Sequence, residues 1–196
     1  HEVREDPKSL ALTRRHDLVH AERFRGIPYP EQIRKIQHRV EAVKSHAQRV
    51  DPDAATPLVV DATGVGKPIL DTFREAGLRP QGVIITSGER ASSSGGMYRV
   101  PKTELVTTLQ VALQAKTLRI AEDLPLAELL LQELRGFRVQ ITASGHARFG
   151  NDVGSWREAE HDDLVLATAL GVWITDRHGS PERNRRQREA LRSFLR

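Results

Sequence analysis

The spacing of apolar and polar positions divides the chain into helices and short strands. Ile33, Ile36, Val40 and Val43 recur at steps of three and four, which predicts a helix over 28–50 with one apolar face. The uninterrupted apolar run 56–60, TPLVV, is typical of a strand in a parallel sheet. The same reading predicts strands at 9–15, 17–25, 81–87 and 117–121, a turn near residues 16–17, and helices at 66–77, 100–116, 123–137 and 159–175.

Glycines, prolines and caps mark the ends of these elements. Gly77 closes one predicted helix, Pro101 opens another, and Asp123 is the predicted N-cap of a third. Residues 88–98, GERASSSGGMY, are small and polar and predict a loop. Residues 137–150 predict a strand and a turn that together form a hairpin.

Strands and helices in this order predict one α/β domain with a central sheet. We place the domain at 1–176 and a basic tail at 177–196, which holds seven arginines and two glutamates, a charge of +5 against +4 for the whole chain. Such arginine-rich ends contact phosphates or form solvated terminal helices.

Composition excludes several classes of protein. The chain has 196 residues and no cysteine, which rules out disulfides and thiolate metal sites. No apolar stretch approaches the roughly 20 residues of a membrane span, and residues 1–10 lack the apolar centre of a signal peptide. We therefore expect an intracellular protein without a membrane segment. Because the first residue is not methionine, we also expect a fragment of a longer chain.

The segment 58–71, LVVDATGVGKPILD, raises two alternatives. A phosphate-binding loop requires four residues between its glycines and a hydroxyl after its lysine. Here one residue separates Gly64 from Gly66, and Pro68 stands at the hydroxyl position, which disfavours a nucleotide site. Asp61 instead ends a predicted strand, where sites form in open α/β sheets. The competing interpretation of Asp61 is a turn or capping aspartate.

A second group of acids precedes the last apolar helix. Glu158, Glu160, Asp162 and Asp163 surround His161. Acids in a first turn can simply complement the helix dipole. Four of them within six residues repel one another unless a cation relieves the repulsion, and carboxylate oxygens suit Mg²⁺. Carboxylates that converge from a sheet and a helix predict two-metal phosphodiester hydrolysis.

These segments also resemble a known family. HAERFRGIPYPEQIRKI, LVVDATGVGKPILDTFREAGL, YRVPKTELVTTLQVALQAKTLRIA, LLLQELRGFRVQIT and EHDDLVLATALGVW are similar to the nuclease domain of the large terminase subunit of tailed bacteriophages and prophages, from about residue 7 to 174. DATGVG and HDDLVLA are the most specific motifs.

The resemblance implies an RNase H-like fold, a central mixed β-sheet flanked by α-helices. It implies a DNA endonuclease that uses Mg²⁺ or Mn²⁺ to cut concatemeric viral DNA during genome packaging in the host cytoplasm. The family's acids match Asp61 and Asp162 or Asp163 as catalytic and metal-binding residues, with both of the last two binding metal or one orienting the other. Implied partners are double-stranded DNA, a packaging ATPase domain, the portal and the small terminase subunit.

The sequence departs from the family pattern in two places. The family carries its first catalytic aspartate on the first strand, and that acid would fall at or just before His1. Either it precedes this chain or the protein lacks it, in which case metal binding is weakened. The packaging ATPase is also not in this sequence.

Further residues are candidates for supporting roles. Lys102, at a predicted helix start, reaches a scissile phosphate or is a surface lysine. His161 binds metal, shuttles protons or makes a supporting hydrogen bond. Basic candidates for backbone phosphate contacts are His146, Arg148, Arg185 and Arg186.

Three functions are thus open. The first is the metal-dependent endonuclease. The second is a catalytically impaired, nucleic-acid-binding RNase H-like domain without the first acid. The third is a nucleotide-binding protein that uses GVGK at 64–67.

Overall fold

The computed structural model describes residues 15–64, 66–141, 147–150 and 162–178. A four-stranded mixed sheet forms its centre, in the order β2-β3-β5-β4. The first three of these strands run parallel, and β4 is an antiparallel edge. The strands are β2 (Leu58–Asp61), β3 (Pro80–Thr86), β4 (Ser92–Ser94) and β5 (Met97–Pro101).

Two short strand pairs complete the β structure. β1 (His16–Leu18) runs parallel to β6 (Leu118–Ile120). β7 (Arg138–Ile141) pairs antiparallel with β8 (Ala147–Gly150), which confirms the hairpin predicted for 137–150.

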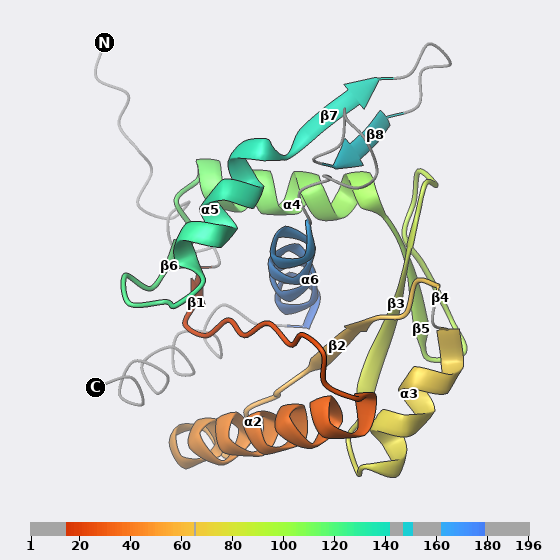
Figure 1. Ribbon diagram of the computed structural model, residues 1–196, viewed down its shortest axis with the longest axis vertical. Helices are drawn as coiled ribbons and strands as arrows, with labels where there is room; N and C mark the ends of the chain where they lie inside the picture. The colour runs from red at the N-terminus through yellow and green to blue at the C-terminus, as the bar shows by residue number, and fades with distance from the viewer. Residues whose placement is uncertain (1–14, 65, 142–146, 151–161, 179–196) are drawn as a thin grey trace.

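Helices cover both faces of the central sheet, which confirms the mixed α/β class. Leu70 of α3 packs on one face, at Gly82, where a Cβ would lie 2.5 Å from Leu70 Cδ1. On the other face α6 lies at the centre of the molecule, between β2 and the pair α4 and α5 (Figure 1). The helices are α2 (Tyr29–Val50), α3 (Gly66–Glu75), α4 (Lys102–Gln114), α5 (Ala127–Gly136) and α6 (Asp163–His178).

The main hydrophobic core joins the sheet to α4, α5 and α6. Val83 and Val100 supply it from the strands, and Leu105 from α4, each with no exposed surface. Trp173 of α6 is 4% exposed and donates its Nε1–H to Glu104 Oε1 at 2.8 Å. Because α6 is apolar on nearly all sides, it requires this enclosed position.

Local predictions were wrong in three regions of the chain. The strand predicted at 17–25 is only β1, and the turn predicted near residues 16–17 lies within it. Its partner β6 is only three residues long, so the ladder ends at Leu18. The loop predicted at 88–98 contains β4 and the start of β5, because Gly95 and Gly96, with φ of 59° and 76°, form a two-residue hairpin turn.

The third error concerns α5, which begins at Ala127 and has no side-chain cap. Asp123 lies in a preceding turn, in which the Leu124 N–H bonds to Ala121 and the Ala127 N–H bonds to Leu124. Pro125 disfavours helical backbone at the residue before it, so the helix cannot start at Asp123. No helix in the described ranges has the length and apolar character needed to cross a membrane.

Candidate functional site

Asp61 is the last residue of β2 and is exposed. Its Oδ1 accepts the N–H of Thr63 at 2.8 Å, and Thr63 Oγ1 accepts the N–H of Ile85 at 2.8 Å. These bonds fix the turn after β2 to the neighbouring strand. Side chains alternate along a strand, so Asp61 projects from the same face as Val59, which packs against the core. Asp61 therefore faces the side of the sheet that α6 covers.

Asp162 and Asp163 stand at the start of α6. The carbonyl of Asp162 accepts the N–H of Leu166 at 2.9 Å, which makes Asp162 the N-cap. Asp162 Oδ2 also accepts a hydrogen bond from Lys102 Nζ at 2.9 Å, and the two side chains are about a quarter exposed. Asp163, 65% exposed, pairs with Arg23 at 3.4 Å. Each of the two carboxylates is therefore paired with a positively charged side chain.

The packing of β2 on α6 places these acids at one end of the molecule's core. Val59 of β2 and Leu164 of α6 line the same cavity of about 530 Å³. Asp61 lies two residues beyond Val59, and Asp162 lies two residues before Leu164. Asp61 and Asp162 are therefore each close in sequence to a residue that lines this cavity, although 100 residues lie between them in the chain.

The strand register shows how these groups are offset. Asp61 is opposite Val83, and Val83 is opposite Tyr98. Lys102 follows Tyr98 by four positions, which corresponds to about 13 Å along an extended strand. The Lys102–Asp162 pair therefore lies further out along the strand direction than Asp61. Within the ranges that the structure describes, no group of three or more His, Asp or Glu side chains has the geometry of a metal site.

Glu133 of α5 is a component of this region that the sequence interpretation missed. Its side chain is 3% exposed, and its Oε2 accepts the N–H groups of Leu164 at 2.9 Å and Val165 at 3.2 Å. A signal was present, because Glu133 follows Leu130 by three residues and so lies on the buried face of its helix. The buried carboxylate anchors the first turn of α6.

The remaining candidates cannot be placed in the site. His146, His161, Arg185 and Arg186 lie outside the described residues, and Arg148 is in β8, whose side chains are not described. Lys102 is the only auxiliary residue with described contacts. Besides its bond to Asp162, its ammonium lies 5.7 Å from the ring centroid of Phe137.

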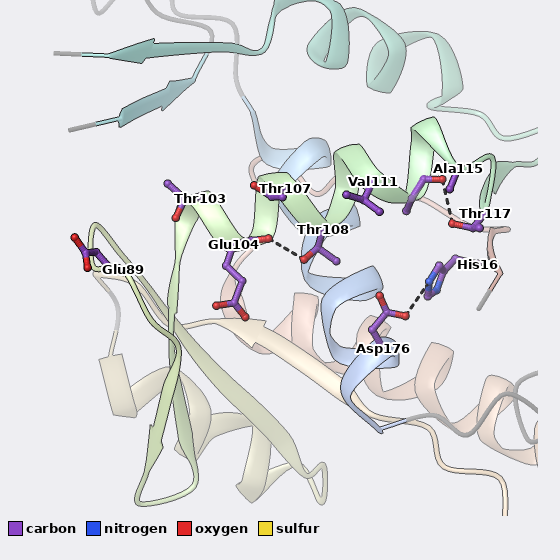
Figure 2. Close-up of a pocket in the computed structure, with 11 residues that line it drawn as sticks. His16, Glu89, Thr103, Glu104, Thr107, Thr108, Val111, Ala115, Thr117 and Asp176 are labelled. Atoms are coloured by element: carbon purple, nitrogen blue, oxygen red, sulfur yellow. Dashed lines mark hydrogen bonds and ion pairs between the residues drawn. The ribbon is translucent and has the colours of Figure 1, made fainter. Parts of the chain in front are cut away.

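A second hollow, of about 730 Å³, runs along α4 from Thr103 to Ala115 and reaches Asp176 of α6 (Figure 2). His16 lines it, with Nε2 at 3.2 Å from Asp176 Oδ1 and Nδ1 at 3.1 Å from Thr175 Oγ1. These contacts fasten β1 to the end of α6. None of the predicted site residues that the structure describes lines this hollow.

No protein-family model matches the chain, and no curated protein or solved structure matches it.

Proposed function

We propose that this chain is the metal-dependent DNA endonuclease domain of a phage large terminase subunit, with an RNase H-like fold. The observation that supports the proposal is the packing of β2 on α6, because Asp61 ends this strand, Asp162 caps this helix, and Val59 and Leu164 near them line one cavity. The motifs DATGVG and HDDLVLA, which supply these acids, support it. Double-stranded DNA is the proposed substrate. The proposed partners are a packaging ATPase domain, the portal and the small terminase subunit, in the host cytoplasm.

The residues at this end of the core suit Mg²⁺ or Mn²⁺. Asp61, Asp162 and Asp163 supply carboxylate oxygens, which hard divalent cations prefer. Lys102 pairs with Asp162 and Arg23 pairs with Asp163, so a divalent cation would compete with these two side chains for the carboxylates. Bound metal would supply an activated water and would stabilise charge on the attacking and leaving oxygens. Exposed Asp61 and Asp163 leave the site open to a DNA backbone, and Lys102 would pair with a phosphate by exchanging or sharing its bond to Asp162.

The proposal predicts that the protein converts supercoiled plasmid to nicked circles in Mn²⁺ and that EDTA stops the reaction. Chelation removes the cation on which water activation depends, and restoring Mn²⁺ should restore cutting. Gel electrophoresis of the plasmid measures the outcome. Cutting that persists in EDTA would contradict a metal-dependent mechanism.

A second candidate is a nucleic-acid-binding domain with this fold but without catalysis. The ion pairs of Asp162 with Lys102 and of Asp163 with Arg23 favour it, because the carboxylates are already neutralised by side chains. Fluorescence anisotropy with duplex DNA should be measured beside the nicking assay, on this chain and on a chain extended upstream of His1. If the extended chain binds DNA and does not cut it, the second candidate replaces the first.

Lys102→Gln is expected to raise the affinity for Mn²⁺ by about fivefold. The ammonium beside Asp162 opposes a second cation by about 1 kcal/mol in a partly exposed position. Titration followed by the Mn²⁺ electron paramagnetic resonance signal measures the change, and Lys44→Gln, at an exposed position of α2, is the matched control. Unchanged affinity would show that the Lys102–Asp162 pair lies outside the cation site.

A further inference from the structure

The first turn of α6 departs from the usual way in which a helix is capped. The N-cap side chain ordinarily accepts the N–H groups of the second and third helical residues. In α6 the N-cap is Asp162, and those residues are Leu164 and Val165. Aspartate is among the best N-cap residues, so its carboxylate is the expected acceptor.

Glu133 occupies that role instead. Its Oε2 accepts both N–H groups, from Leu164 at 2.9 Å and from Val165 at 3.2 Å. The carboxylate of Asp162 turns away from its own helix and binds Lys102 Nζ at 2.9 Å. We infer that Glu133 caps α6 in place of Asp162 and so keeps the Asp162 carboxylate available to cations in the site. This replacement of Asp162 by Glu133 as the cap, the cap exchange, does not depend on the proposed function. Only the role of Asp162 toward a divalent cation rests on that function.

Capping of α6 by Glu133 costs more free energy than capping by its own N-cap residue, Asp162. Glu133 is 3% exposed, and its Oε1 is buried with no hydrogen-bond partner among the described residues. Burial of a carboxylate oxygen without a donor is unfavourable, whereas capping by Asp162 would bury nothing further. Local rules of this kind are broken mostly at functional sites. Glu133 is therefore a positioning residue that acts through the backbone of α6.

The test begins with Asp162→Ala and the hydrogen exchange of the Leu164 and Val165 amides, followed by NMR. Because Glu133 is their acceptor, their protection should stay within about twofold of wild type. If Asp162 were the cap, protection would fall by about tenfold, the effect of losing a cap. A tenfold fall would overturn the inference.

Glu133→Leu and Glu133→Gln give the complementary measurement. In Glu133→Leu, Asp162 should turn back to cap α6, so both amides stay protected, and protection should fall by about tenfold only in Glu133→Leu/Asp162→Ala. Glu133→Gln retains an acceptor oxygen and should leave Asp162 on Lys102. Equal loss in Glu133→Leu and in the double variant would show that Asp162 cannot take over the cap, and the inference would fail.

Binding of Mn²⁺ tests whether the cap exchange affects the proposed metal site. Paramagnetic broadening of the Asp162 amide signal should be strong in wild type and Glu133→Gln, and at least about tenfold weaker at equal Mn²⁺ in Glu133→Leu. Equal broadening in all three would contradict a positioning role. If wild type shows no broadening while the amide results hold, the proposed metal site fails and the cap exchange stands.

Discussion

Asp61→Ala is expected to abolish Mn²⁺-dependent nicking of supercoiled DNA while the protein stays folded. Asp61 is exposed at the end of β2, and the one hydrogen bond described for its side chain lies within its own turn. The substitution therefore removes little packing. Loss of a carboxylate that binds metal directly should lower the nicking rate by more than the 10–100-fold typical of supporting residues, so at least about 100-fold. Plasmid nicking measures the rate, and circular dichroism verifies the fold.

Two variants separate charge from structure in this experiment. Asp61→Asn retains an oxygen for the N–H of Thr63 but removes the charge, so it should lose activity as Asp61→Ala does. Asp71→Asn removes an exposed carboxylate of α3 that pairs with Arg74, and it should leave the nicking rate unchanged. Undiminished nicking by Asp61→Ala would remove this residue from the proposed site.

Leu105→Ala is expected to cause a large loss of stability, about 3 kcal/mol in the free energy of unfolding. Leu105 has no exposed surface and lies in the core that joins α4 to α6 and the sheet. Truncation of such a leucine removes buried apolar surface and leaves a cavity that the surrounding helices fill only in part. Urea denaturation monitored by tryptophan fluorescence measures the change.

The matched control for this prediction is on the same helix. Val111 is 56% exposed, so Val111→Ala should change the free energy of unfolding by no more than about 0.5 kcal/mol. A comparable loss in both variants would show that burial of Leu105 is not the cause, because alanine is the better helix former at both positions.

Elements that local pattern determines were predictable from the sequence. The helix predicted at 28–50 is α2, and Ile33 on its apolar face is 3% exposed. The apolar run before Asp61 is a strand in a parallel pair, as predicted. β4 was missed because three serines carry no alternation of apolar and polar residues. The extent of β1 depends on β6, about 100 residues later, so no local pattern reports it.

The site was predictable only in part, for a similar reason. The acids before an apolar helix identified the start of α6, where Asp162 and Asp163 now stand. The ion-pair partner of each acid was not predictable, because Lys102 and Arg23 belong to parts of the chain that are distant in sequence from α6. Glu133 is part of an ordinary helical repeat, and its capping role exists only after α5 and α6 pack together. The assignment of these acids to metal binding stays a prediction.

The junction of β5 and α4 limits how far Lys102 can move toward an anion. Pro101 ends the strand and is almost fully buried, and Lys102 begins the helix with no connecting residue between them. A backbone held in this way cannot swing, so the ammonium moves only as far as its own four-carbon stem allows. Asp162 already pairs with this ammonium, so an incoming anion must approach within the reach of that stem and share the ammonium with Asp162 or displace it.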